Sequence, residues 1–367
     1  MDKIQMVDLY SQYMEIKPVI DQAINDVIND SSFINGRAVN EFVQNLSSWN
    51  QTKHIIPCAN GTDGLQVAMM ALDLKPGQEV IVPAFTYIAT VEVIALLGLK
   101  PVFVDVDLET FNLKVDEVEH ALTDKTAAIV PVHLYGQCVD MESLNNLAKQ
   151  YKLHVIEDLA QAIGAEYNGC KSGNLGDVGV TSFFPSKNLG CYGDGGALFT
   201  NDDELANKIR MIVNHGQSKK YHHDVIGVNS RLDTIQAAVL NEKLKKLAEY
   251  TLNRQNAADH YDEMLSEIPS IKIPVRSESS THVFHQYTIK VKDCRNELKQ
   301  YLTEKGIPSM IYYPLQVPKQ KAYQHYTDRT FTNSEMLSKE VLSIPMHSHL
   351  TSDQLSFICE TVKSFFS

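Results

Sequence analysis

The stretch "TSFFPSKNLGCYGDGGALFTND", residues 181–202, carries a single lysine, Lys187, between an aromatic run and a run of glycines. Four glycines follow it within the seven-residue span 190–196: Gly190, Gly193, Gly195 and Gly196. Glycine occurs where the backbone takes a positive φ or closely approaches another group. A lysine held at such a turn is either a solvated charge or a nucleophile. The surrounding sequence has to distinguish these two possibilities.

The composition describes an ordinary globular chain. Its 367 residues are 44% apolar and 21% charged, which fits one or two domains with a large core. The net charge of −12 argues against non-specific nucleic-acid binding, because such binding depends on Lys and Arg neutralising phosphates. The six cysteines form no C-x-x-C pair, so neither a metal site nor a disulfide framework is indicated. No signal segment or membrane span is evident, and we expect a cytoplasmic protein.

Short apolar runs alternate with helical patterns from residue 54 to residue 158. The predicted strands are 54–59, 79–83, 101–106, 127–134 and 153–158. The predicted helices between them are 62–74, 87–98 and 141–151. Strands alternating with helices predict a mainly parallel sheet, and continuously apolar strands predict helices on both of its faces.

The pattern changes near residue 230. Residues 232–265 form one long helical stretch without Gly or Pro, and a strand at 283–291 and helices at 295–306 and 355–367 follow. We expect an α/β protein with a large domain, residues 1–250, and a smaller C-terminal α+β domain, residues 251–367.

Three polar clusters follow predicted strands, where ligands bind in α/β sheets of this kind. The first is "ANGTDG", residues 59–64, which opens a helix. Backbone amides at a helix N-terminus attract anions, and Gly61 would allow a ligand to approach closely. The alternative is that Thr62 or Asp63 only caps the helix.

The second cluster is "VIEDLAQAIGA", residues 155–165, in which Asp158 ends a strand and Gln161 follows three residues later. Asp158 either caps the next turn or points into the site, where it could hold a cationic ring nitrogen. The third cluster contains Ser182 and Lys187. Lysine amines form Schiff bases with carbonyl compounds and with pyridoxal phosphate.

The combination is more specific than its parts. A phosphate cradle, a carboxylate for a pyridinium nitrogen and a Schiff-base lysine are the protein groups that pyridoxal phosphate requires. They occur here in that order, with Asp158 and Lys187 29 residues apart. The sequence therefore favours pyridoxal-phosphate chemistry at the edge of the sheet.

At this point the sequence resembles the sugar aminotransferases of the DegT/StrS type, which have the aspartate-aminotransferase-like fold (fold type I). The resemblance covers nearly the whole chain. The motifs that carry it are "SSFINGRAVNEF", "NGTDGLQVAMMAL", "GQEVIVPAFTYIATVEVIALLG", "VIEDLAQAIGA", "SFFPSKNLGCYGDGGALFTND", "GVNSRLDTIQAAVL" and "GIPSMIYYPL".

The resemblance implies roles for individual residues around the cofactor ring. Lys187 would form the Schiff base and move protons. Asp158 would pair with the pyridinium nitrogen, and Gln161 would reach the ring hydroxyl. Tyr87, in "PAFTYIAT", would stack on the pyridine ring, although without the resemblance it would be taken for a core residue.

The resemblance also implies a phosphate site shared between two subunits. Thr62 and Asp63 would offer backbone amides to the phosphate, and Ser182 would offer its hydroxyl. Asn229, in "GVNSRLD", would reach the phosphate from the neighbouring subunit of a homodimer. Taken alone, Asn229 is an ordinary turn residue before a helix.

The substrate-binding residues that the resemblance implies are Arg231, Tyr312 and Tyr313. Many relatives carry His-Tyr-Pro where this chain has Tyr312, Tyr313 and Pro314, so a relative's substrate does not transfer directly. The implied reaction passes the amino group of L-glutamate, through pyridoxamine phosphate, to a keto nucleotide sugar. The closest resemblance is to enzymes for UDP-linked 3-oxo sugars of the 2-acetamido-3-oxo-glucuronate type, in bacterial surface-polysaccharide precursor synthesis.

The sequence leaves other interpretations of the substrate and of the function open. The alternative substrates are 4-keto or dTDP-linked deoxysugars. A pyridoxal-phosphate-dependent sugar dehydratase would carry histidine in place of the Schiff-base lysine, so Lys187 counts against it. A regulatory protein is a non-enzymatic alternative, but no helix-turn-helix is evident. A nicotinamide enzyme is disfavoured because "GNLGDVG", residues 173–179, lacks the G-x-G-x-x-G order.

Overall fold

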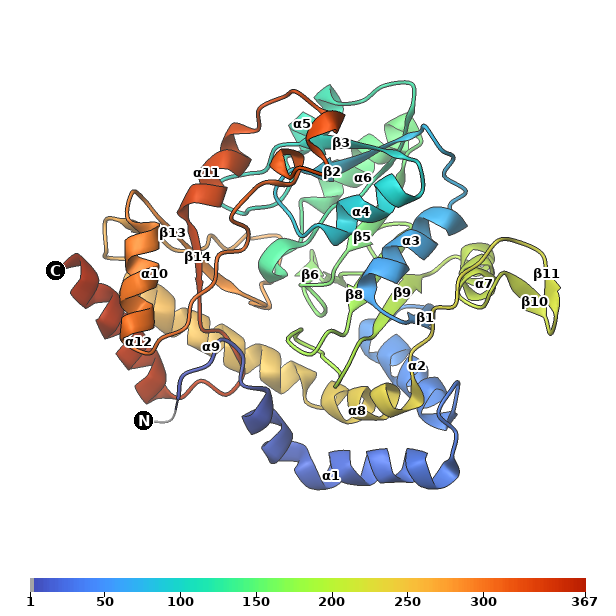
Figure 1. Cartoon of the computed structure of the whole chain (residues 1–367), viewed down its shortest axis with the longest axis horizontal. Helices are drawn as coiled ribbons and strands as arrows, with labels where there is room; N and C mark the ends of the chain where they lie inside the picture. Colours follow the sequence, from blue (N-terminus) through green and yellow to red (C-terminus); the bar gives the residue numbers. More distant parts are fainter. Residues whose placement is uncertain (1–2) are drawn as a thin grey trace.

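The computed structural model describes residues 3–367 as a seven-stranded central sheet with helices on both faces, beside a smaller three-stranded sheet (Figure 1). The α-helices are α1 (Leu9–Asp30), α2 (Arg37–Asn50), α3 (Gly61–Ala71), α4 (Ala89–Leu96), α5 (Val115–His120), α6 (Met141–Tyr151), α7 (Asp203–Ile212), α8 (Thr234–Leu244), α9 (Leu247–Leu265), α10 (Arg295–Glu304), α11 (Thr332–Glu340) and α12 (Ser352–Phe366). The strands are β1 (His54–Cys58), β2 (Glu79–Pro83), β3 (Lys100–Val104), β4 (Thr126–Ile129), β5 (His154–Asp158), β6 (Glu166–Tyr167), β7 (Cys170–Lys171), β8 (Val178–Ser182), β9 (Gly196–Thr200), β10 (Gln217–Lys219), β11 (His222–His223), β12 (Ile271–Lys272), β13 (Tyr287–Val291) and β14 (Val341–Ile344).

The central sheet has the strand order β1-β9-β8-β5-β4-β2-β3. Strand β9 is antiparallel to both of its neighbours, β1 and β8, and the pairs from β8 to β3 are all parallel. The prediction of a mainly parallel sheet is therefore confirmed. Because the parallel strands share a direction, their carboxyl ends meet at one edge, and the residues that follow β5 and β8 lie close together.

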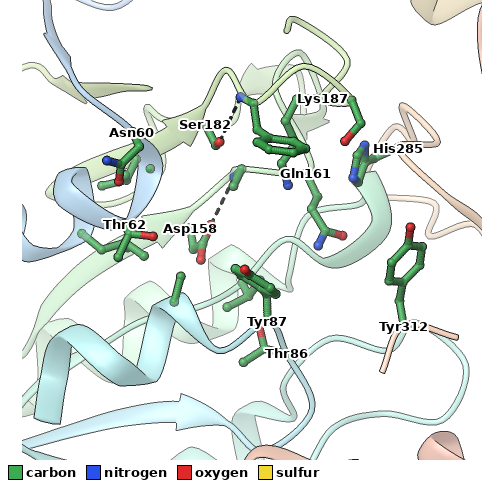
Figure 2. Close-up of a pocket in the computed structure, with 18 of the residues that line it drawn as sticks. Asn60, Thr62, Thr86, Tyr87, Asp158, Gln161, Ser182, Lys187, His285 and Tyr312 are labelled. Atoms are coloured by element: carbon green, nitrogen blue, oxygen red, sulfur yellow. Dashed lines mark hydrogen bonds between the residues drawn. The ribbon is translucent and has the colours of Figure 1, made fainter. Parts of the chain in front are cut away.

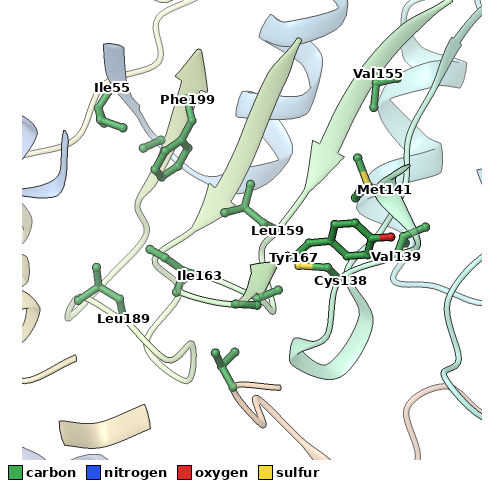
Figure 3. Packing of buried hydrophobic residues seen from close by; sticks show 14 of the residues in the cluster. Ile55, Cys138, Val139, Met141, Val155, Leu159, Ile163, Tyr167, Leu189 and Phe199 are labelled. Atoms are coloured by element: carbon green, nitrogen blue, oxygen red, sulfur yellow. The ribbon is translucent and has the colours of Figure 1, made fainter. Parts of the chain in front are cut away.

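Both faces of the central sheet are buried, as its apolar strands predict. Neighbouring residues on one strand enter different clusters: Ile55 packs in the cluster with α2, α6 and α8, whereas Ile56 packs in the cluster with α3, α4 and α7. Figure 3 shows part of the first cluster, in which Phe199 of β9 and Leu159 after β5 belong to the same packed layer. Alternate side chains on a strand point to opposite faces, so one strand serves two cores.

The C-terminal part has its own core around the sheet β12-β13-β14. Helices α9, α10 and α12 contribute buried residues to this core, including Tyr261, Leu298 and Ile358. The smaller α+β unit of the sequence analysis thus corresponds to a separate cluster of packed side chains. The domain boundary near residue 250 stays a prediction; that residue lies in the first turn of α9.

The prediction of one continuous helix over residues 232–265 is wrong. The chain forms two helices, α8 and α9, which are separated at Lys245 and Lys246. Helix α8 packs against α1 and α2, whereas α9 packs against α12 and the small sheet's core. Buried residues of α8 and the first residue of α9, Leu247, pack in the core of the large sheet, whereas later residues of α9 such as Tyr261 pack in the core of the small sheet. No Gly or Pro marks this change in the sequence.

A fully buried carboxylate ties the carboxyl half of β5 to the loop before β8. Glu157 accepts hydrogen bonds from the backbone amides of Gly173, Leu175 and Gly176 at 2.7–2.8 Å, and His133 Nε2 lies 3.1 Å from it. His133 Nδ1 accepts from the Val139 amide, so its Nε2 carries the proton and donates to Glu157. Removing this carboxylate would leave several buried donors unpaired, so its hydrogen bonds are costly to break. They hold the end of β5 in place, and with it the neighbouring residue Asp158.

Candidate active site

A cavity of about 480 Å³ opens at the carboxyl ends of β5 and β8. Its size is within the range of ligand pockets in other proteins. Figure 2 shows Asp158 and Lys187 in the middle of the site, between Asn60 and Thr62 on one side and His285 on the other. The lining residues are Asn60, Gly61, Thr62, Leu65, Thr86, Tyr87, Ala89, Val132, Tyr135, Asp158, Ala160, Gln161, Val180, Ser182, Phe184, Ser186, Lys187, Asp194, His285, Gln286, Tyr312 and Tyr313.

The loop after β8 turns Lys187 into the cavity. The Lys187 amide donates to the Phe184 carbonyl at 2.8 Å, and the chain then folds back until the Cys191 amide donates to the Phe183 carbonyl at 2.8 Å. A Cβ at Gly190 would lie 2.3 Å from the Pro185 carbonyl oxygen. The prediction of a tight glycine turn is therefore confirmed. Close backbone approach, and not a positive φ, is what requires glycine at this position.

The Lys187 amine has an unusual electrostatic environment. Burial in the cavity wall lowers its pKa from the ordinary 10.5 to about 8, and the nearby Asp158 carboxylate offsets part of this effect. A desolvated ammonium loses its proton more readily because the surroundings solvate the charge poorly. At neutral to mildly alkaline pH the neutral, nucleophilic amine is thus far more populated than for a lysine in water.

Asp158 is the last residue of β5, and its side chain is held in one orientation. Its Oδ2 accepts from the Thr90 hydroxyl at 2.7 Å, and its Oδ1 accepts from the Ala160 amide at 3.1 Å. The residue is 7% exposed and lines the cavity. The carboxylate is consequently positioned by protein groups before any ligand arrives. Thr90 was not identified in the sequence analysis.

Gln161 and the two tyrosines of the late loop meet across the cavity. Gln161 Oε1 accepts from the Tyr135 amide at 2.8 Å, and its Nε2 donates to the Tyr313 hydroxyl at 3.1 Å. The Tyr135 hydroxyl donates to the carbonyl of Tyr312. Tyr87 is 56% exposed, and its ring centroid lies 6.0 Å from that of Tyr313. The aromatic side chains therefore form a wall with one open ring face.

The start of α3 differs in detail from the expectation. The N-cap is Asn60, whose side chain accepts from the Asp63 amide at 2.8 Å, so neither Thr62 nor Asp63 caps the helix. The Asp63 carboxylate faces away from the cavity and accepts from the Ser230 hydroxyl at 2.7 Å. In this structure the Asp63 amide donates to the Asn60 side chain, so the role of that amide toward a phosphate stays a prediction. Thr62 lines the cavity as expected.

A close contact joins the two halves of this end of the cavity. A Cβ at Gly61 would lie 2.9 Å from Ser182 Cβ, so glycine lets α3 begin directly against the end of β8. The Ser182 hydroxyl accepts from the Phe184 amide at 3.2 Å and also lines the cavity. The helix N-terminus and this hydroxyl together form a small, donor-rich cradle of the kind that holds phosphate groups.

Two residues that the sequence analysis assigned to the site do not line the cavity of a single chain. Asn229 is exposed and forms a β-bridge with Asn214, and Arg231 is only partly buried on the same segment before α8. Several cavity residues were in turn missed. Asn60 could have been found from its place directly before a helix, whereas Tyr135, Asp194 and His285 have no local sequence signal.

The lowered pKa of Lys187 gives a test in the cofactor-free protein. The folded-state pKa lies below that of the unfolded chain, so the charged amine destabilises the fold below pH 8, and this cost disappears as the pH rises toward 10.5. Lys187→Met should raise the free energy of unfolding at pH 7 by about 3 kcal/mol, with the gain shrinking toward pH 10. Denaturant titrations at both pH values measure this, with Lys149→Met, at an exposed lysine, as the control. A gain that is the same at both pH values would contradict the assignment.

Comparison with known proteins agrees with this geometry. UDP-2-acetamido-2-deoxy-3-oxo-D-glucuronate aminotransferase of Pseudomonas aeruginosa is 46% identical, with 97% of this chain and 98% of that protein covered. A pleiotropic regulatory protein of Geobacillus stearothermophilus is 45% identical, with 99% and 98% covered. The sequence similarity therefore extends over both the large and the small sheet.

The solved structures and the family model lead to the same result. S. venezuelae DesV in complex with a ketimine intermediate has a TM-score of 0.97 and 36% identity, covering 100% of this chain and 99% of that chain. NtdA of Bacillus subtilis with bound cofactor PMP has a TM-score of 0.92 and 30% identity, covering 100% of this chain and 86% of that chain. Residues 14–363 match the model of the DegT/DnrJ/EryC1/StrS aminotransferase family, and the chain belongs to this family.

Proposed function

We propose that this chain is a pyridoxal-phosphate-dependent aminotransferase that moves the amino group of L-glutamate to a keto nucleotide sugar. The observation that carries the proposal is one cavity with a desolvated amine, Lys187, a fixed carboxylate, Asp158, and a donor-rich helix N-terminus at Gly61 and Thr62. These groups fit the aldehyde, the ring nitrogen and the phosphate of pyridoxal phosphate.

The cofactor, when bound, supplies an electron sink for the bonds at the substrate carbon. Asp158 is proposed to keep the ring nitrogen protonated, because its oxygens are already oriented by Thr90 and Ala160. Lys187 is proposed to hold the cofactor covalently through Nζ and afterwards to carry the proton as a general base and acid, a role that suits an amine with a pKa of about 8.

The remaining cavity residues are proposed to bind and orient. Thr62 and Ser182 hold the phosphate of the cofactor. The exposed face of the Tyr87 side chain stacks on the pyridine ring of the cofactor. Gln161 reaches the ring hydroxyl with the amide that contacts Tyr313 in this structure. The Asp63 carboxylate accepts a hydrogen bond from the Ser230 hydroxyl and in this way stabilises the start of α3, which forms part of the cradle.

The proposed substrate is a UDP-linked 3-oxo sugar of the 2-acetamido-3-oxo-glucuronate type. The support is the name of the Pseudomonas aeruginosa relative and that of a UDP-N-acetyl-3-dehydro-alpha-D-glucosamine aminotransferase of Acidithiobacillus ferrooxidans at 43% identity. A dTDP-3-amino-3,6-dideoxy-alpha-D-galactopyranose transaminase of Aneurinibacillus thermoaerophilus, at 41% identity, supports the dTDP-linked alternative. The proposed amino sugar would enter the synthesis of a bacterial surface polysaccharide.

Two other readings have less support. A dehydratase of this fold would carry histidine in place of the catalytic lysine, whereas Lys187 lines the cavity here. The regulatory name of the Geobacillus relative suggests a non-enzymatic role. A purely regulatory protein has no need of a desolvated amine opposite a fixed carboxylate, so the site favours the enzyme.

A substrate panel tests the proposed reaction. The purified protein, loaded with pyridoxal phosphate, is incubated with L-glutamate and with UDP- and dTDP-linked 3-keto and 4-keto sugars. We expect amination of the UDP-linked 3-oxo uronate with the highest kcat/KM, identified by mass and by NMR. Lys187→Ala is the control and should form no product. Preferred turnover of a 4-keto sugar, or release of a deoxygenated sugar without amination, would replace the proposed substrate or reaction.

We propose further that the active unit is a homodimer in which each cavity is completed by the other subunit. Among residues 3–367, the Lys187 amine is the single cationic side chain that lines the cavity, and Asp158 and Asp194 are the anionic ones. Cofactor and nucleotide sugar bring several phosphate charges, which one amine does not balance. Asn229 and Arg231 lie outside the cavity of their own chain and are proposed to enter the partner's. Closed twofold dimers are the commonest soluble assembly.

Subunit mixing tests the shared site. The Lys187→Ala and Asn229→Asp proteins should each be nearly inactive, the second because its added charge repels the phosphate. In a mixed dimer of a shared-site enzyme, one site carries both defects and the other carries neither. Activity should therefore return on mixing, toward roughly a quarter of wild type per total site for random pairing. If native mass spectrometry shows exchanged subunits and no activity returns, Asn229 serves its own subunit.

No helix within residues 3–367 is long and apolar enough to cross a lipid bilayer. We propose that the enzyme works in the cytoplasm, where glutamate and nucleotide sugars are made.

A further inference from the structure

His285 is a buried residue of the cavity wall that has no role in the reaction or in the cofactor binding proposed above. It is 5% exposed and lines the cavity on the side away from Asn60 and Thr62, close to Lys187 in Figure 2. Its Nδ1 has no hydrogen-bond partner among residues 3–367. Unpaired buried polar atoms are rare in folded proteins, and they are often found where a ligand provides the missing partner.

The chain holds His285 in place from several directions. Asn188, next to the catalytic lysine, donates to the Val283 carbonyl at 2.9 Å. The buried Arg254 donates to the Phe284 carbonyl at 3.1 Å. Phe284 itself has a φ of 44°, a left-handed value that is costly for a residue with a side chain. Backbone strain of this kind persists only when the surroundings enforce it, and it is concentrated at functional sites.

Gly136 completes this arrangement from the other side. It has a φ of 116°, and a Cβ there would lie 2.9 Å from the Phe284 amide nitrogen and 3.0 Å from that of His285. The Val283 amide donates to the Gly136 carbonyl at 2.9 Å, and the Gln286 amide donates to the Tyr135 carbonyl at 3.3 Å. The segment before β13 is thus locked against the large domain, and the imidazole has little freedom to leave the cavity wall.

The imidazole is neutral in this environment. Burial is the main cause that lowers the pKa of His285 well below its usual range, and the charges of Lys187 and Arg254 add to it. The side-chain amide nitrogen of Gln286, its Nε2, lies 3.5 Å from His285 Nε2. With the Gln286 side chain in this orientation its Nε2 donates and His285 Nε2 accepts, so the ring proton is assigned to Nδ1. The unpaired atom is consequently a neutral N–H donor.

We propose that His285 contacts the substrate, and that its Nδ1–H donates a hydrogen bond to an oxygen of the molecule bound beside Lys187. The acceptor is either a carboxylate oxygen of the amino donor or an oxygen of the keto sugar, since the two proposed substrates would bind in turn in the same cavity beside Lys187. A neutral donor suits this place because it orients an oxygen without adding a second cation next to Lys187. The inference rests on the proposed aminotransferase function.

Three variants of His285 distinguish the effect of losing the hydrogen-bond donor from the effect of changing the volume of the side chain. In His285→Asn the amide nitrogen can take the position of Nδ1, whereas in His285→Gln it takes the position of Nε2. His285→Phe keeps the ring shape and removes both nitrogens. The Tm and the visible absorption of the bound cofactor serve as folding controls for each variant.

Binding to the holoenzyme is measured by calorimetry with two unreactive probes. Glutarate represents the amino donor, and UDP-N-acetylglucosamine, which lacks a ketone, represents the sugar. Loss of one hydrogen bond should raise the Kd for one probe roughly tenfold in His285→Phe and in His285→Gln. His285→Asn should restore most of the affinity. The probe that responds identifies the source of the acceptor oxygen, and kcat/KM of the corresponding half-reaction should fall in parallel.

Two results would overturn the proposal. One is a wild-type Kd for both probes in His285→Phe. The other is an equal loss in His285→Asn and His285→Gln, which would mean that the ring contributes packing and not a donor at Nδ1. Because the probes do not react, a wild-type enzyme that binds them but fails to transfer an amino group would disprove the proposed reaction while still testing His285.

Discussion

The parallel pairing of β5 with β8 is the constraint on which the site depends. Asp158 lies opposite Val180 in this pair, so the carboxylate and the loop that carries Lys187 emerge at the same edge of the sheet. The buried Glu157 fixes this edge by binding three loop amides, and helices on both faces exclude water from the strands. An amine and a carboxylate that are far apart in sequence are thus brought to one cavity by strand direction and register.

The same geometry explains why the lysine is chemically unusual. The glycine turn after β8 folds the chain so closely that a side chain at Gly190 would collide with the Pro185 carbonyl. This turn holds Lys187 in the wall of the cavity, where desolvation lowers its pKa to about 8. A poorly solvated ammonium at Lys187 lowers the free energy of unfolding, but the same environment makes the neutral, nucleophilic amine more populated. Stability is exchanged for function at this residue, as is common at active sites.

Much of this arrangement could be predicted from the sequence. The alternation of apolar strands and helices indicated the parallel sheet, and Asp158 and Lys187 stood out because Asp158 ends one strand and Lys187 follows another. Features that depend on tertiary packing could not be predicted. The break at Lys245 and Lys246 has no helix-breaking residue, and it lies near the place where the helical segment passes from the core of the large sheet to that of the small one. The N-cap was expected at Thr62 or Asp63, whereas the structure has it at Asn60.

His285 had no local signal at all. It comes from the segment before β13, which belongs to the smaller unit in sequence and meets the cavity only in the folded chain. Asn229 and Arg231 show the opposite case. The family resemblance implied that they belong to the site, although they lie outside the cavity of a single chain. The homodimer proposed above would account for this difference, because each cavity would then receive them from the partner.

The central claim is that Lys187 is the amine that binds the cofactor. Borohydride reduction of the protein loaded with pyridoxal phosphate, followed by proteolysis and mass mapping of the peptides, tests it most directly. The account predicts one reduced adduct, on the peptide that contains Lys187. An adduct on another lysine, or no adduct at saturating pyridoxal phosphate, would contradict it.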